Sequence, residues 1–238
     1  MKISKSATLS ATIAGLVISA NFAHAAVTAV NASNATEATF LPVSGDLLET
    51  SVAMTTDFGW STVNGANVSF LNDGSYGLVY VSGPVQVDGG WDQGGGSPNP
   101  VITYDLDIST NTMGYDLTSI VSIAGWNGAG LGNQQFTVEV STVGSAAFTL
   151  LATGNNQLLG ATGVGNTMVT IEDDTTSGAV IASNVDAVRF TSLGSVGTNN
   201  WSVFREFDVN GVASVPVPEP SSLLLLGFGG LALLRRRR

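Results

Sequence analysis

Short runs of alternating apolar and polar residues, separated by turn residues, are the feature of this sequence that most restricts its fold. The run QFTVEVS, from Gln135 to Ser141, places Phe136, Val138 and Val140 on one side of an extended chain. Six further runs are short, rich in β-branched or aromatic residues and bounded by turn residues: 101–108, 119–126, 146–153, 167–173, 186–192 and 201–209. We therefore predict an all-β domain.

The arrangement of these runs favours a β-sandwich over other all-β architectures. Residues 26–215 show no sustained apolar period of 3.6 residues, so we expect few helices. The runs cluster without an even hairpin spacing or a blade repeat, which argues against an up-and-down barrel or a propeller. Two glycine-rich stretches, 89–100 and 125–134, are predicted to be loops. The second lacks the glycine spacing of a dinucleotide site and precedes a strand.

The N-terminal segment has the layout of a secretory signal peptide. Lys2 and Lys5 supply the positive charge, an apolar stretch runs over 9–20, and Ala23-His24-Ala25 provides a cleavage site of small residues. We assign 1–25 to the signal peptide, with an uncleaved N-terminal anchor as the alternative. Residues 26–215 then form the β-sandwich domain, which is long enough for a core of its own.

The composition of residues 26–215 excludes several function classes. Of the 18 acidic residues 17 lie here, against two basic ones, Arg189 and Arg205, and 2 minus 17 leaves a net charge of −15. Such a charge repels nucleic acid, so we expect no nucleic-acid partner. The chain has no cysteine, and its single histidine, His24, and both lysines lie in the predicted signal peptide. Thiol and histidine-dependent catalysis and cysteine- or histidine-bound metals are therefore excluded from the domain.

The last 23 residues, 216–238, differ from everything before them. They contain Pro218-Glu219-Pro220, an apolar stretch over 223–234 and four terminal arginines. With the two preceding serines the stretch has 14 residues, about 21 Å as a helix, against about 30 Å of bilayer hydrocarbon. The segment is too short to span the hydrocarbon core readily as a permanent anchor. Its three glycines lower its helix propensity, which argues against a helix of a soluble domain.

The order of these features resembles the PEP-CTERM sorting signal. The resemblance implies a Gram-negative bacterium, transient insertion of the C-terminal helix in the inner membrane as a transmembrane segment, and recognition by the membrane enzyme exosortase. The product would then be released or attached at the cell surface or in the extracellular matrix. A permanent anchor is the alternative. The residues that carry the sorting signal are Pro218, Glu219, Pro220, Arg235, Arg236, Arg237 and Arg238.

The strand sequences, in their order along the chain, resemble the discoidin-like, galactose-binding-domain-like sandwiches. The segments that carry the resemblance are 71–74 (LNDG), 102–106 (ITYDL), 115–126 (YDLTSIVSIAGW), 136–142 (FTVEVST), 185–192 (VDAVRFTS) and 204–211 (FREFDVNG). The resemblance implies a jelly-roll-type antiparallel β-sandwich that binds carbohydrate through loops at one end. The domain departs from the family pattern because it lacks a histidine for the sugar site and has Val143-Gly144 in place of an Asp-Gly turn.

The same resemblance implies a structural calcium ion. Its ligands would come from an early loop and the last strand, at the positions occupied here by Asn72, Asp73, Ser75 and Glu206. Oxygen atoms of this kind are the ligands that calcium takes. The alternative is that Asp73-Gly74 forms a turn and that Glu206 is a solvated strand residue.

Tryptophans are the residues best suited to bind a sugar in a domain without histidine or lysine. An indole face packs against the apolar face of a pyranose ring, so we predict ligand contacts by Trp91, Trp126 and Trp201, with Trp60 as a further candidate. For each of the four, packing in the core is the alternative.

The combined prediction is an exported, non-catalytic cell-surface or biofilm matrix protein whose sandwich binds exopolysaccharide and whose tail is sorted by exosortase. Two alternatives stay open. One is a structural matrix protein without a specific ligand. The other is an enzyme that acts on glycans with a pair of carboxylates, a catalytic arrangement that the composition permits.

Overall fold

The computed structural model describes residues 26–34, 40–43, 45–56, 60–61, 68–75, 90–92, 99–126, 128, 130–196 and 200–216. Within these ranges the chain forms eleven strands and one short 3-10 helix, η1 (Val68–Asn72). The predicted signal peptide, 1–25, and the sorting signal from 217 onward lie outside the described residues. In the part of the chain that the structure describes, no helix has the length and apolarity needed to cross a membrane.

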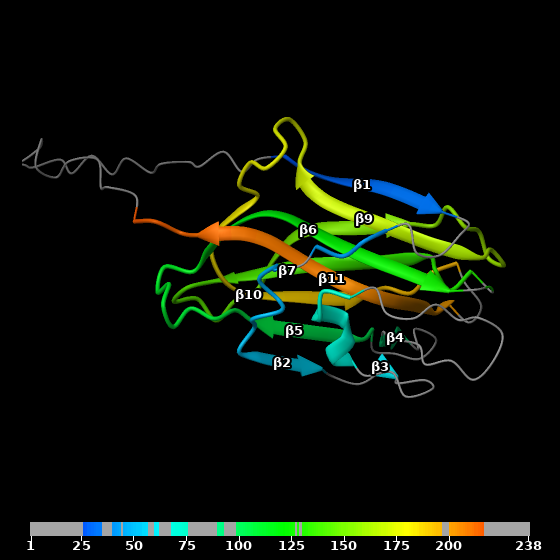
Figure 1. Ribbon diagram of the computed structural model, residues 1–238, viewed down its shortest axis with the longest axis horizontal. Coiled ribbons are helices and arrows are strands. Elements are labelled where there is room, and N and C mark those ends of the chain that lie inside the picture. Colours follow the sequence, from blue (N-terminus) through cyan, green and yellow to red (C-terminus); the bar gives the residue numbers. More distant parts are fainter. Residues whose placement is uncertain are drawn as a thin grey trace, which may run out of the picture.

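The strands form two facing layers, and every strand pairing is antiparallel (Figure 1). The layer called here the β10 sheet has the order β2 (Ala53–Thr56), β5 (Val101–Asp105), β10 (Ala182–Ser192), β7 (Gln134–Thr142) and β8 (Thr149–Asn156). The other layer, the β6 sheet, has the order β1 (Val27–Asn34), β9 (Gly165–Asp173), β6 (Tyr115–Trp126), β11 (Ser202–Ala213), β4 (Gly90–Asp92) and β3 (Trp60–Ser61).

The two layers are joined at the start of β10. Ala182 and Val185 pair with β6, after which β10 crosses to β7 and β5. The crossing coincides with a break in register, where Asn184 has a φ of 58°. Asparagine tolerates this left-handed conformation better than most residues do. Such bulges bend a strand and allow it to pass from one sheet to the other.

Aromatic side chains from both layers fill the space between the sheets. Phe190 of β10 stacks on Phe207 of β11 with ring centroids 4.2 Å apart, and Phe136 of β7 meets Phe204 of β11 at 6.2 Å. These four rings are buried. Gly154 of β8 makes room for them, because a Cβ there would lie 2.4 Å from the ring of Phe136. The inward positions of the strands therefore build one core, as their alternation predicts.

The predicted fold class, an all-β antiparallel sandwich, is confirmed, and all seven predicted runs contain strands. The prediction that 89–100 is entirely loop is wrong, because residues 90–92 form β4 by pairing with β11. Strands β1, β2 and β3 were not predicted. They are short or rich in alanine, asparagine and threonine, and tertiary pairing with β9, β5 and β4 makes them strands.

Candidate functional site

A cluster of three buried carboxyl groups lies beside β11. Glu206 and Asp208 come from β11, and Asp46 comes from the segment that runs along that strand. Each residue contributes one carboxylate oxygen to a group whose members lie within 4.8 Å of one another. Glu206 and Asp208 are fully buried and Asp46 is 4% exposed. We call these three residues the acidic cluster.

The local sequence explains why these side chains face one another. A break in register after Phe204 shifts the alternation of β11, so that Phe207 and Val209 enter the core while Glu206 and Asp208 lie on the other side of the strand. The amide of Leu47 donates to the carbonyl of Val209 at 2.8 Å. This bond fixes the segment 45–50 along β11 and brings Asp46 to the two strand carboxylates.

Backbone amides hold one oxygen of each carboxyl group. Oδ1 of Asp46 accepts from the amides of Leu48 at 2.7 Å and Val209 at 3.0 Å. The amide of Val43 donates to Oδ2 of Asp208 at 2.9 Å, and the amide of Gly74 donates to Oε1 of Glu206 at 3.0 Å. The chain therefore orients the three groups through residues 40–43, 45–49 and 72–75 together with β11.

The second oxygen of each group is buried without a hydrogen-bond partner. These atoms are Asp46 Oδ2, Glu206 Oε2 and Asp208 Oδ1, and the fully buried hydroxyl of Tyr104 is also without a partner. Buried polar atoms of this kind are costly unless something satisfies them. Such an arrangement of oxygens suits a hard divalent cation, which would neutralise the charge and fill the empty acceptor positions.

Burial controls the protonation of the cluster in the absence of a cation. Desolvation raises the pKa of Asp46 to about 6, that of Glu206 to about 9 and that of Asp208 to about 7. The amide hydrogen bonds act in the opposite direction, and the neighbouring carboxylates add to the rise. Burial also raises the pKa of the Tyr104 hydroxyl, with further contributions from Glu206 and Asp46.

The structure brings only part of the predicted calcium ligand set together. The Gly74 amide contact places loop 72–75 against Glu206. Asn72 uses its amide nitrogen to donate to the carbonyl of Leu48 at 2.8 Å. Asp73 and Ser75 are exposed, and Oδ1 of Asp73 accepts from the amide of Ser75 at 2.9 Å, which is the turn expected in the alternative. The other part of that alternative is wrong, because Glu206 is buried and not solvated.

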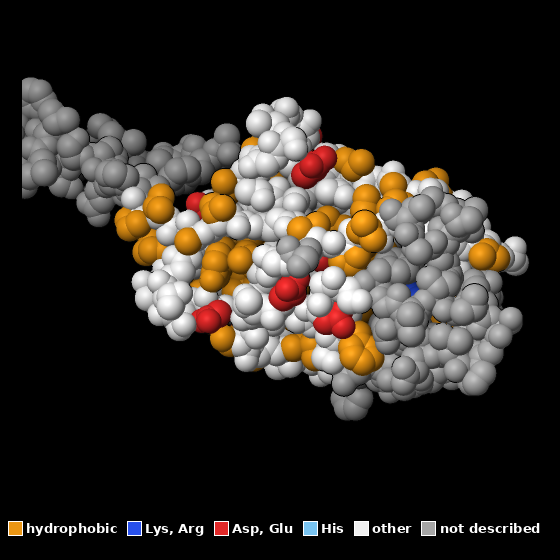
Figure 2. Space-filling model, in the orientation of Figure 1, with side chains coloured by type: hydrophobic (Ala, Val, Ile, Leu, Met, Phe, Trp, Pro, Cys, Tyr) orange, Lys and Arg blue, Asp and Glu red, His pale blue; other side chains and the backbone are white. Residues whose placement is uncertain are grey.

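Sequence reasoning missed two members of the acidic cluster, Asp46 and Asp208. Asp208 follows Glu206 by two residues, and that spacing within the last strand was a signal that could have been used. Asp46 lies 160 residues away in the sequence, in a stretch without strand character, so only the tertiary pairing identifies it. Figure 2 shows several separate acidic patches on this face of the molecule.

The predicted sugar-binding tryptophans lie at three places in the fold. Trp60 packs against Phe204 and Phe207, with ring centroids 5.9 and 6.5 Å away, so it belongs to the core. Trp126 and Trp201 are both half-buried against Leu131 and Val203 at one end of the sandwich. Trp91 lies on β4, whose backbone pairs with Val203. The structure thus brings Trp126 and Trp201 together around a small apolar cluster.

Replacing Trp201 by Ala tests how much this end cluster contributes to stability. We expect the melting temperature to fall by about 4–8 °C, because truncation of a half-buried tryptophan costs about 2 kcal/mol in a domain of this size. The measurement is thermal unfolding followed by near-ultraviolet circular dichroism. A melting temperature within 1 °C of the parent protein would show that the indole does not stabilise the fold. Thr170→Val, at a half-buried position on β9, is the control.

Comparison with known families identifies the tail. The model of the PEP-CTERM protein-sorting motif matches residues 216–238, the segment that the sequence predicted as a sorting signal. That motif indicates an exported protein. A search of curated proteins finds no match to this chain.

Solved structures with a similar course of the chain include several carbohydrate-binding modules. One is the module CBM32-5 of CpGH89 from Clostridium perfringens, in complex with GalNAc-β-1,3-galactose: 16% identity, 69% of this chain and 99% of that chain covered, TM-score 0.43. Another is CBM32-3 from a family 31 glycoside hydrolase of the same organism, with 20% identity, coverage of 68% and 90%, and a TM-score of 0.41. A third is a pectin-binding module, with 15% identity, coverage of 70% and 94%, and a TM-score of 0.38.

Proposed function

We propose that this chain is an exported surface protein that binds glycan through its sandwich and is delivered by processing of its C-terminal tail. The observation that carries the delivery part is the match of residues 216–238 to the PEP-CTERM sorting motif. The order of features fits a transient membrane intermediate: prolines keep the cleavage region extended, the apolar stretch enters the inner membrane, and the arginines stay on the cytoplasmic side. Exosortase of a Gram-negative host is the partner that this signal implies.

Glycan binding is supported by the ordered strand motifs that resemble discoidin-like sandwiches, together with the two-layer antiparallel architecture. The ligand we propose is the exopolysaccharide of the producing cell, because an exported protein meets that polymer outside the cell. The domain charge of −15 argues against polyanions such as nucleic acid as ligands, because it repels them. We propose a non-catalytic role. The acidic cluster is the one group of three close carboxylates among the described residues, and its burial closes it to a substrate.

We further propose that the acidic cluster binds a structural calcium ion. Asp46, Glu206 and Asp208 would supply the carboxylate oxygens that now lack partners, and loop 72–75 would close the site through the contact of Gly74 with Glu206. In this arrangement the ion would tie residues 40–43, residues 45–49 and η1 to β11. Its role is to stabilise the fold, because a site buried in this way does not reach a glycan.

A printed array of neutral and uronic-acid oligosaccharides tests the glycan-binding role. We expect the exported protein, purified from its host with calcium present, to be retained on at least one oligosaccharide class. Retention on none of them, with a folded protein by circular dichroism, would favour a structural matrix protein without a specific ligand. Release of shortened products from the array would instead favour the glycan-active enzyme.

A further inference from the structure

The outer face of the β10 sheet carries a row of polar side chains that crosses four strands. Thr55 of β2 pairs with Thr103 of β5, Thr103 pairs with Arg189 of β10, and Arg189 pairs with Glu139 of β7. The neighbouring residues in each strand, such as Ile102, Val188 and Val138, are buried in the core. The four polar residues therefore share the face that points away from the other sheet.

A groove of about 400 Å³ follows this row. A volume of this size lies within the range of sites that bind small molecules. Thr55 and Thr56 are exposed at one side, so the groove is open to solvent. The groove is lined by Thr55, Thr56, Val101, Thr103, Glu139, Arg189 and Thr191.

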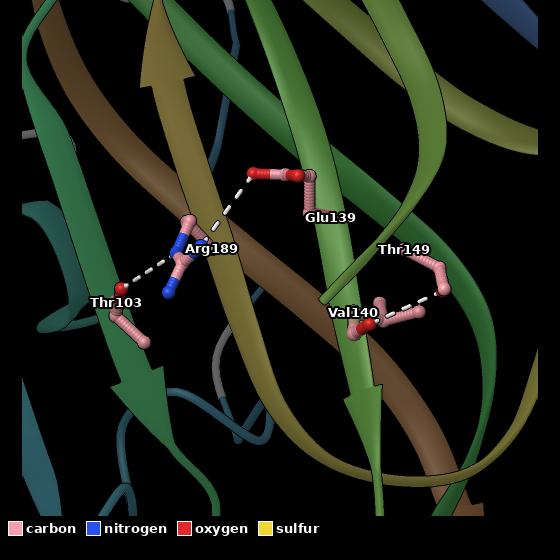
Figure 3. Close-up of polar contacts among 5 residues, drawn as sticks. All are labelled: Thr103, Glu139, Val140, Thr149 and Arg189. Atoms are coloured by element: carbon pink, nitrogen blue, oxygen red, sulfur yellow. Dashed lines mark hydrogen bonds and ion pairs between the residues drawn. The ribbon is translucent and has the colours of Figure 1, made fainter. Parts of the chain in front are cut away.

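Arg189 is held in a fixed orientation at the centre of the row (Figure 3). Its Nε donates to Oγ1 of Thr103 at 3.3 Å, and its Nη1 lies 3.9 Å from Oε2 of Glu139. The guanidinium carbon lies 3.6 Å from the centroid of the Phe148 ring. The side chains of Arg189 and Glu139 are 33% and 29% exposed, so both remain accessible to a ligand. A guanidinium has five N–H donors, and these two polar contacts do not use all of them.

The outer face of the other layer differs in character. On the β6 sheet, Val121 and Ile123 are buried, with Phe40 and Met168 packed against them. That face is thus partly covered by the chain's own residues. The β10 sheet instead presents hydroxyls, a cation and a carboxylate side by side.

We propose that this groove is the glycan-binding surface and that it takes a neutral chain with adjacent hydroxyl groups, an inference that rests on the proposed glycan-binding function. A hydroxyl both donates and accepts a hydrogen bond. Two neighbouring sugar hydroxyls can therefore accept from Arg189 and donate to Glu139 at the same time, while Thr55, Thr103 and Thr191 contact the flanking hydroxyls. A uronate is a weaker match, because its carboxylate would approach Glu139 in a domain with a charge of −15.

The test uses the exported protein, purified from its host, and four variants with single substitutions. Arg189→Gln removes the guanidinium, Glu139→Gln keeps the shape of the side chain without its charge, and Thr103→Val removes one hydroxyl. Thr170→Val on β9 is the matched control, because it makes the same change on the other layer. Binding is measured by calorimetry with the neutral oligosaccharide that the array retains best, and folding is checked by thermal unfolding.

We expect Arg189→Gln to weaken binding by about tenfold or more and Thr103→Val by about threefold, with Thr170→Val unchanged. Glu139→Gln and Thr103→Val carry the test if Arg189→Gln does not fold. If all three groove variants bind the glycan as well as the parent protein does, while Trp126→Ala or Trp201→Ala loses binding, the groove proposal is wrong. The ligand would then bind at the loop end. Binding of uronates only would overturn the neutral ligand class. If the parent protein binds no glycan, the proposed function fails first and this inference fails with it.

Discussion

Removal of calcium with EGTA is expected to lower the melting temperature of the exported protein by about 5–10 °C at pH 8 and millimolar calcium. A ligand present at about 100 times its dissociation constant stabilises a protein by about 2.7 kcal/mol, and each kcal/mol corresponds to about 2–4 °C in a domain of this size. The physical reason is the set of three buried carboxylate oxygens without partners. Thermal unfolding with and without EGTA gives the measurement, and magnesium is the control for selectivity.

The calcium-free protein should also become less stable as the pH rises from 5 to 9. The pKa values of Asp46, Asp208 and Glu206 are raised to about 6, 7 and 9, above their ordinary values near 4. The folded state therefore binds more protons than the unfolded state between about pH 4 and 9. Since stability falls with pH wherever the folded state binds more protons, the stabilisation present at acid pH is lost across this window. Under the calcium proposal, the bound ion should remove this dependence.

The substitution Glu206→Gln distinguishes the effect of a bound calcium ion from the cost of burying the Glu206 carboxyl group. Without calcium at pH 8 this variant should melt above the parent protein, because burial raises the pKa of Glu206 to about 9 and the parent protein must therefore bind a proton there to fold at this pH, whereas glutamine needs none. Its response to calcium should be lost or strongly reduced. Asp174→Asn, at an exposed turn position, is the control and should leave both values unchanged. A parent protein whose melting temperature at pH 8 is the same in calcium and in EGTA would contradict the calcium proposal.

Replacement of Pro218, Glu219 and Pro220 by alanine is expected to block processing of the tail almost completely. The motif carries the proposed sorting signal, and alanines would allow a helix formed by the apolar stretch 223–234 to extend back into the proposed cleavage region, because the prolines that would prevent this are gone. Intact-mass measurement of the membrane and surface fractions should then show the full tail retained in the membrane. The parent protein should instead appear at the surface without its four terminal arginines.

Two results bear on the alternatives for the tail. Ser221→Ala and Ser222→Ala together are the control, since they change neighbouring residues and keep the motif. This control should be processed like the parent protein. A parent protein recovered from the surface with Arg238 in place would contradict processing and favour a permanent anchor.

Much of the fold was predictable because local pattern and tertiary environment agree in the central strands. In the run 135–141, phenylalanine and valine alternate with polar residues, and the inward set is buried as predicted. The edge strands were not predictable in this way. β1 and β2 carry few large apolar residues, and their pairing with β9 and β5 decides their conformation.

The candidate sites were less predictable because they depend on register and long-range contacts. Glu206 was named from resemblance, but Asp46 reaches it only through the pairing of segment 45–50 with β11. The polar row exists because four strands pair in a register that places Thr55, Thr103, Arg189 and Glu139 side by side. The spacing of these residues along the sequence does not predict that register. The tail is different, because its motif is contiguous in the sequence and can be recognised without knowledge of the fold.

The central claim is that the exported protein binds the polysaccharide of its own cell. The direct measurement is co-sedimentation of the purified exported protein with the host's exopolysaccharide, in calcium and in EGTA, with Arg189→Gln and Thr170→Val alongside. We predict that the parent protein and Thr170→Val sediment with the polymer and that Arg189→Gln stays largely in solution. A folded parent protein that remains in solution at every polymer concentration would contradict the account.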